Sequence, residues 1–260
     1  MAMGDKSMGD FGFDPRKYKD ARHRFGLEVN KAAGLSTKLN GSRSNHGREF
    51  WSSILFAKLV LSALTVNKIL PNRPSRSSRE LWDLASIATL VRGMAENYLM
   101  LYWLCTETEN ADLWDLRITL LTMCDNRARY RMTAELEGEP EPTDFANAQF
   151  NLSQHLWKNS LFTALPENRK KSLIKADKFP FIQDEVISCL VVNKDLFRRY
   201  YRYLSSFVHT GTISFFRMQE KRRGGGEFND YDANAMGGAM ELAILALKGA
   251  TVDVKSIHGL

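Results

Sequence analysis

The sequence predicts an all-α protein, a multi-helix bundle of about seven or eight helices. Two observations carry this prediction. Several long segments place apolar residues at the three- and four-residue spacing of a helix face, and Pro, Ser, Asn or Gly residues mark their ends. No segment alternates apolar and polar residues beside a hairpin signal, so the sequence gives no support to a β-sheet.

The composition indicates a globular, mildly basic protein. The 260-residue chain is 44% hydrophobic and carries a net charge of +6, which is compatible with an anionic partner such as RNA. Cys105, Cys124 and Cys189 lie far apart with no CxxC spacing, as expected of buried thiols in a reducing compartment. The N-terminus has no apolar signal-peptide core, and the run Ile54 to Val66 is too short to span a bilayer. We therefore expect a cytoplasmic protein without a membrane partner.

The N-terminal half predicts an arm followed by two long helices. Residues 1–42 are rich in Gly, Ser, Lys and Arg, so we expect a flexible or partly helical arm, with a short helix around Tyr18 to Ala32. Residues 43–260 then form a single all-α domain. Its first helix covers 48–70 and ends at Pro71 and Pro74. Ser77 and Glu80 have the spacing of a capping box, which predicts a second helix over 80–105.

The remaining segments continue the helical pattern. A third helix begins near Ala111 and ends at the loop EGEPEPT. The further helical segments are 144–165, a short basic stretch over 167–176, 194–216 with Asn193 as its N-cap, and a final helix of small residues over 233–250. The segment 182–192 is ambiguous between a short helix and a buried strand.

The second helix contains a charged pair in apolar surroundings. Arg92 and Glu96 lie one turn apart on a helix that is apolar nearly all round, as a central core helix is. A lone buried charge is very costly, so the two side chains pair with each other or meet partners from another helix. Two interpretations stay open. The pair either fixes helix register, or it lines or braces a polar pocket.

A polar face on the helix over 194–216 is the second unusual feature. Arg202, Ser205, Ser206 and His209 fall within about 60° of one another in helical projection, opposite an aromatic face. Such a set suits work on phosphodiesters, because an arginine orients a phosphate and a histidine exchanges protons near neutral pH. The alternative is a histidine satisfied within a helix–helix contact.

Familiar cofactor and metal motifs are absent from the sequence. There is no P-loop, no HExxH, no Glu-x-x-His and no GxSxG, and RRGGGE follows no predicted strand. We therefore expect no cofactor and no metal.

The spacing Arg202-x6-His209 resembles the R-x4-6-H signature of the HEPN superfamily, all-α domains named for higher eukaryote and prokaryote nucleotide binding. Separately, Arg92-x3-Glu96 followed later by Ser205-x3-His209 is similar to the pattern of a family of uncharacterised bacterial helical proteins. The resemblance covers residues 50–216 and implies a HEPN-like bundle.

The resemblance also implies an activity. In catalytic HEPN proteins, two Arg/His sets face each other across a homodimer cleft and cut RNA without metal. It implies that His209 is the general acid or base and that Arg202 holds the phosphate. The residues expected to bind substrate or brace the site are Arg92, Glu96, Arg199, Ser205 and Ser206.

Three functions follow as hypotheses. The first is a metal-independent ribonuclease of toxin or phage-defence type, acting as a homodimer. The second is a non-catalytic module that binds a nucleotide, a small ligand or a protein. The third is an antitoxin-like or scaffold protein with the polar face buried in a subunit contact. Arg202 and His209 open at a two-fold interface with basic surface around them would favour the first, and contact of both with Arg92 and Glu96 inside the monomer would favour a binding or structural role. We also expect Glu96 and His209 to lie close together.

Overall fold

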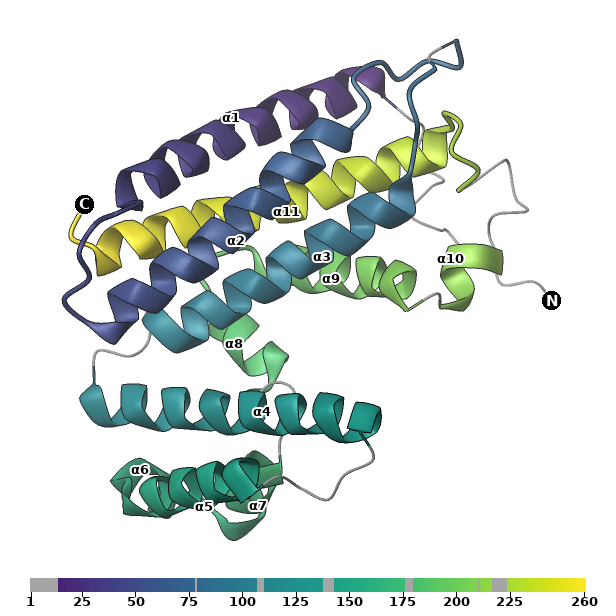
Figure 1. Cartoon of the computed structure of the whole chain (residues 1–260). Coiled ribbons are helices and arrows are strands. Elements are labelled where there is room, and N and C mark those ends of the chain that lie inside the picture. The colour runs from purple at the N-terminus through teal and green to yellow at the C-terminus, as the bar shows by residue number, and fades with distance from the viewer. Residues whose placement is uncertain are drawn as a thin grey trace. The chain divides into compact units, whose positions relative to one another are not determined.

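The protein is all-α in the computed structural model, which describes residues 14–77, 79–106, 110–137, 143–175, 180–209, 211–216 and 224–260 (Figure 1). The α-helices in these ranges are α1 Pro15–Leu39, α2 Gly47–Ile69, α3 Leu84–Leu101, α4 Ala111–Glu137, α5 Thr143–Lys158, α6 Ser160–Thr163, α7 Glu167–Lys175, α8 Gln183–Cys189, α9 Lys194–Val208, α10 Thr212–Phe216 and α11 Asp230–Ile257. A π-helical turn, Tyr102–Thr106, follows α3 directly. The described residues contain no strand, so the predicted fold class is confirmed.

The helices of the described chain are more numerous than expected, because two of the predicted helices are divided. Asn159 ends α5 and caps α6 by accepting from the backbone N–H groups of Leu161 and Phe162, so the predicted helix over 144–165 is two helices. The predicted helix over 194–216 is also divided, because α9 ends at Val208 and α10 begins at Thr212. The ambiguous segment 182–192 contains α8 and no strand. The prediction that Asn193 caps α9 is confirmed, since its side chain accepts from Leu196 N.

The chain divides into two compact units, and the prediction of a single domain over residues 43–260 stays a prediction. The first unit joins Met1–Tyr102 to Ile187–Leu260, and the second is the intervening Trp103–Val186. Both ends of the sequence contribute to the first unit. A change of composition along the chain therefore does not show where one unit ends and the other begins.

The expected N-terminal arm is largely an integral helix of the first unit. Residues 1–13 lie outside the described residues, but α1 runs for 25 residues from Pro15. Asp14 caps it by accepting from Arg16 N, and Pro15 occupies a first-turn position that needs no backbone donor. Its buried residues recur every three or four positions: Tyr18, Ala21, Phe25, Val29, Ala32, Leu35 and Leu39. This spacing, rather than the Gly-, Ser- and Lys-rich composition, determines the structure.

Helix α11 is the centre of the first unit, and α1, α2, α3 and α9 pack on it (Figure 1). Two glycines permit close approach. A Cβ atom at Gly238 would overlap the Tyr200 ring of α9, and one at Gly249 would overlap the Tyr98 ring of α3. Small residues on α11 therefore set how closely its neighbours pack, as the sequence predicted for this helix.

One end of the first unit is joined by an aromatic cluster. Trp82 is fully buried, with its ring 5.3 Å from that of Tyr18 and 4.9 Å from that of Phe228. Its backbone N–H donates to the carbonyl of Gly226 at 2.9 Å, and the Tyr18 hydroxyl donates to the carbonyl of Pro71 at 2.8 Å. Three segments far apart in sequence are thereby held together.

The predicted capping box of Ser77 and Glu80 is wrong. Helix α3 begins at Leu84, and the N-cap is Asp83, which accepts from Ser86 N at 3.0 Å. The Glu80 carboxylate instead accepts from the backbone N–H groups of Asn72 at 2.9 Å and Arg73 at 2.8 Å. Glu80 thus closes the loop between α2 and α3, where Pro71 and Pro74 exclude helix.

The second unit has its own small core formed by α4 to α7. The buried side chains are Leu116, Leu120, Met123, Leu156, Phe162 and Leu173. Beside them His155 bonds Asp115 at 2.8 Å, and the Asn159 side chain donates to the carbonyl of Asp112 at 2.9 Å. These bonds fix α5 and α6 against α4.

Two helices of the described chain, α2 and α11, are long and apolar enough by length and composition alone to cross a membrane. Core helices of soluble proteins meet the same test, and 61% of the apolar window of α11 but only 33% of that of α2 is buried inside the protein. The cytoplasmic location and the absence of a membrane partner stay predictions.

We expect Gly249→Ala to lower the free energy of unfolding by roughly 1–3 kcal/mol, because the added methyl group overpacks the buried Tyr98 ring. Gly237→Ala on the same helix is the matched control. A Cβ atom there meets nothing within 4 Å, so the gain in helix propensity is unopposed and stability rises by up to about 1 kcal/mol. Thermal unfolding measures both variants, and equal effects would contradict the close packing at Gly249.

A second prediction concerns the pH dependence of stability. Burial raises the pKa of Asp253 from 3.8 to about 6, although a hydrogen bond from Tyr98 opposes the shift. The folded protein therefore holds this proton to higher pH than the unfolded chain, and its stability falls as pH rises from 3.8 to about 6. We expect Asp253→Asn to match the natural protein near the lower pH and to exceed its stability above the upper one. A stability difference between the two proteins that is independent of pH would contradict this assignment.

Candidate functional site

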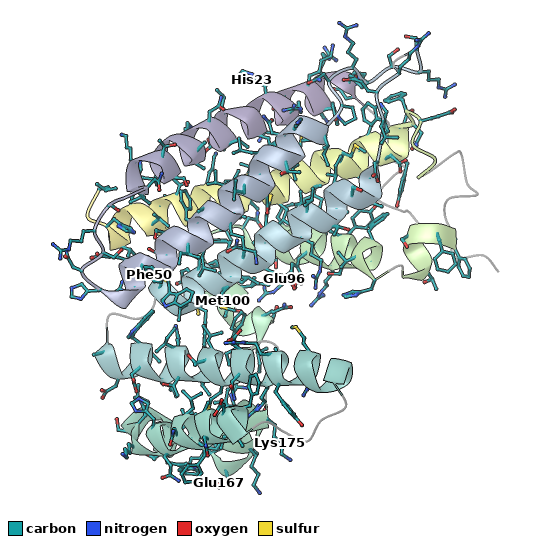
Figure 2. All side chains as sticks on the ribbon, in the orientation of Figure 1. His23, Phe50, Glu96, Met100, Glu167 and Lys175 are labelled. Atoms are coloured by element: carbon teal, nitrogen blue, oxygen red, sulfur yellow. The ribbon has the colours of Figure 1, made fainter. Side chains whose placement is uncertain are left out.

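Two facing helices of the first unit assemble a polar cluster. Helix α3 contributes Arg92 and Glu96, and α9 contributes Tyr201 and Ser205; we call these four residues the Arg92 cluster. Arg92 Nη1 lies 2.9 Å from Glu96 Oε1, and Arg92 Nε donates to Ser205 Oγ at 2.8 Å. Figure 2 labels Glu96 on α3. The structure thus brings together three of the residues that the sequence predicted for the site.

Tyr201 completes the cluster. Its hydroxyl donates to Glu96 Oε1 at 3.1 Å and accepts from Arg92 Nη2 at 3.2 Å. The Arg92 guanidinium also lies over the Tyr201 ring, 5.0 Å from its centroid, which adds a cation–π contact. Tyr201 is not among the site residues predicted from the sequence. The available signal was its position four residues before Ser205 and four after Phe197, which places it at the border of the polar and apolar faces.

The bonding capacity of Arg92 is largely used within the cluster. All three of its guanidinium nitrogens have partners, and the Ser205 hydroxyl donates a hydrogen bond to the carbonyl of Tyr201 at 2.7 Å. The side chains of Arg92 and Glu96 are 14% and 23% exposed, so the pair is mostly withdrawn from water. Glu96 neutralises Arg92 locally, and the cluster is suited to holding α9 on α3.

Arg202 and His209 lie outside this cluster. Both side chains are exposed, and neither has a hydrogen bond or ion pair to another described residue. Helix α9 ends at Val208, so His209 is the C-cap residue and its backbone is no longer helical. The predicted polar face therefore divides in two, with Ser205 turned toward α3 and Arg202 and His209 at the surface.

The turn after α9 determines where His209 sits. The carbonyl of Ser206 accepts from Gly211 N at 2.8 Å, and the Ser206 hydroxyl donates to the carbonyl of Tyr203 at 2.7 Å. These bonds end the helix one residue before His209. The direction of the His209 side chain therefore cannot be calculated from Arg202 by counting helical turns. The proximity of His209 to Glu96 stays a prediction.

The neighbouring basic residues of α9 have separate surroundings. Arg199 is exposed, and its positive charge lowers the pKa of Tyr200, which burial raises by a larger amount. Arg198 donates to Ser188 Oγ at 2.8 Å and so ties α9 to α8. Arg199 and Arg202 are thus the exposed cations of α9 that stand nearest the C-cap.

Within the part of the chain that the structure describes, no three His, Cys, Asp or Glu side chains are grouped as metal ligands. The expectation that the protein uses no metal stays a prediction.

We expect Arg92→Met to destabilise the protein by roughly 1–3 kcal/mol, because it leaves the Glu96 carboxylate without its counter-ion in a mostly buried position. The double variant Arg92→Met/Glu96→Met loses less than the sum of the two single changes, with a coupling of about 1 kcal/mol. Lys31→Met is the control, because Lys31 is 65% exposed in its pair with Glu28 and such pairs contribute about 0–1 kcal/mol. Calorimetric unfolding tests this set, and additive single effects would refute the coupling.

The comparisons with known proteins add no family assignment. No family model matches the chain, and neither a curated protein nor a solved structure shows significant similarity to it. The functional argument accordingly depends on the residues of α3 and α9 themselves.

Proposed function

We propose that this protein is a metal-independent ribonuclease of HEPN type, with Arg202 and His209 as its reacting groups. The observation that supports it is the division of the polar face of α9. Ser205 of α9 bonds Arg92 of α3 in a mostly buried position, whereas Arg202 and His209, also from α9 and its C-cap, are exposed. An exposed guanidinium can hold a phosphate, and an exposed imidazole can exchange a proton near neutral pH, and both roles contribute to phosphodiester cleavage without metal.

The proposed reaction is an internal transesterification of RNA. His209 accepts the proton of a ribose 2′-hydroxyl, whose oxygen forms a new bond to the adjacent phosphorus atom. The bond from phosphorus to the 5′-oxygen of the next nucleotide breaks, and that oxygen takes up a proton. The products are a 2′,3′-cyclic phosphate and a 5′-hydroxyl end, and no external co-reactant is consumed.

Arg202 has the electrostatic role in this proposal. Its guanidinium donates to the nonbridging phosphate oxygens and offsets the negative charge that develops on them in the transition state. Arg199, exposed on the same helix, offers a second cation to an adjacent phosphate. The homodimer that the resemblance implies supplies a second imidazole, which protonates the leaving oxygen.

The Arg92 cluster acts in this proposal as a positioning device. Arg92, Glu96, Tyr201 and Ser205 fix α9 on α3, and through α9 they fix the position of the C-cap turn that carries His209. Their substitution is expected to affect cleavage through the geometry of α9 and not through contact with the substrate.

A second candidate is a module that binds RNA or a nucleotide without cleaving it, and one observation favours it. Tyr203, which follows Arg202 directly, donates its hydroxyl to that of Tyr231 at 2.9 Å and packs its ring edge-on against Phe207. In the HEPN ribonucleases that the sequence resembles, the corresponding position is usually polar. A Tyr203 engaged in packing offers no further polar group for catalysis.

The proposal predicts cleavage of labelled single-stranded RNA in the presence of EDTA. We expect His209→Ala and Arg202→Ala each to reduce the cleavage rate by about 100-fold or more, because each removes a group that acts on the reacting atoms. His23→Ala is the matched control, since His23 is an exposed histidine on α1 (Figure 2). A 2′-deoxy substitution at the cut site should abolish cleavage there.

The outcomes separate the two candidates. RNA binding by a folded protein that cuts nothing in EDTA favours the binding module. Cleavage that persists in the His209 and Arg202 variants contradicts the assigned site, even if the protein is a ribonuclease.

A further inference from the structure

A groove on the opposite part of the first unit is independent of the α9 site. It has a volume of about 540 Å³ and lies between the C-terminal half of α1 and the exposed side of α2. Its α1 wall and following loop are mostly polar, with Ser36, Thr37, Asn40, Ser42 and Ser44. Its α2 wall is mostly apolar, with Phe50, Ile54, Ala57, Leu61 and Leu64. We call this the α1–α2 groove.

The apolar wall is exposed to an unusual degree. Phe50 is 50% exposed, Ile54 43%, Leu61 65% and Leu64 41%. Phe50 marks the N-terminal end of this wall in Figure 2. The opposite face of α2 buries Phe56, Leu59, Ala63 and Val66 completely, so α2 already satisfies the core without these side chains. A continuous exposed apolar surface of this kind marks an interaction site.

The spacing of the wall indicates the shape of its occupant. Residues 50, 54, 57, 61 and 64 alternate four- and three-residue steps, which is the heptad pattern of a helix that packs along another helix. At about 1.5 Å per residue the wall is about 21 Å long, enough for roughly 14 residues of a docked helix. The two helices α1 and α2 form the walls of this groove, as in helix-in-groove recognition.

The charge around the groove indicates the flanks of the occupant. From Ala33 to Leu64, the span that lines the groove, the chain has four basic residues, Lys38, Arg43, Arg48 and Lys58, and one acidic residue, Glu49. The Glu49 carboxylate accepts from Asn45 N at 2.7 Å. Lys58 and Lys68 on α2 and Arg43 in the preceding loop are exposed. An occupant with acidic residues beside its apolar face meets this surface with complementary charge.

We propose that the α1–α2 groove docks an amphipathic helix with acidic flanks from another protein. A second copy of this chain is a poorer occupant, because antiparallel pairing of two α2 helices sets Lys58 against Lys58 near the middle of the wall. A lipid surface is also a poorer occupant, since the α1 wall presents hydroxyl and amide groups that a helix surface can bond and acyl chains cannot.

The test uses the full chain and two fluorescent 21-residue peptides. Both have Leu at the a and d heptad positions; one has Glu at e and g, the other Lys. We expect fluorescence anisotropy to show binding of the Glu peptide at least tenfold tighter than the Lys peptide, with an affinity that falls as salt increases. Leu61→Glu/Leu64→Glu should weaken binding of the Glu peptide at least tenfold, and Lys58→Glu/Lys68→Glu should remove the preference between the peptides.

Val252→Glu on α11 is the matched control, because Val252 is an equally exposed apolar residue at 67%. It should leave peptide binding unchanged. Since Leu61 and Leu64 are exposed, their variants should keep the helical circular dichroism spectrum of the natural protein.

Four results would overturn the proposal. They are equal binding of both peptides, binding of neither peptide, binding to anionic vesicles without binding of the Glu peptide, and a concentration-dependent dimer that Leu61→Glu/Leu64→Glu dissociates. None of these depends on ribonuclease activity, so this proposal and the proposed function fail or stand separately.

Discussion

The close approach of α3 and α9 to the backbone of α11 is the constraint on which the first unit depends. Gly238 and Gly249 leave room for the rings of Tyr200 and Tyr98, and no larger residue fits at either position without displacing a ring. The two helices lie against the same central helix, and they also pack against each other. That adjacency is what lets Arg92 on α3 reach Tyr201 and Ser205 on α9.

Much of the fold could be predicted from local sequence, and the failures have specific causes. The apolar periodicity of α2, α3 and α11 and the Asn193 cap of α9 are local signals, and the structure follows them. The length of α1 was underestimated, because the prediction relied on the Gly-, Ser- and Lys-rich composition and not on the three- and four-residue spacing of the apolar residues. Glu80 was assigned to a helix cap although its carboxylate bonds backbone groups seven and eight residues earlier, a loop contact that no capping motif describes.

The candidate site could be predicted in part for the same reason. Arg92 and Glu96 are conspicuous because charge is costly among apolar residues, and their pairing follows from the helical spacing. The separation of Ser205 from His209 could not be predicted, since it depends on the Ser206–Gly211 bond that ends α9. A projection that treats 194–216 as one helix places the two residues on one face, whereas the structure places them on either side of a helix end.

The order of the elements along the chain has a consequence for synthesis. The first unit is discontinuous, and α11, its central helix, is encoded after the whole second unit. The buried faces of α1, α2 and α3 therefore leave the ribosome well before the helix that covers them. The second unit can form its own core first, while the apolar residues of the first unit stay uncovered until α11 has been synthesised. The apolar faces of these helices are thus exposed during translation, and the contacts that finally cover them span most of the length of the chain, an arrangement that is typical of slower folding.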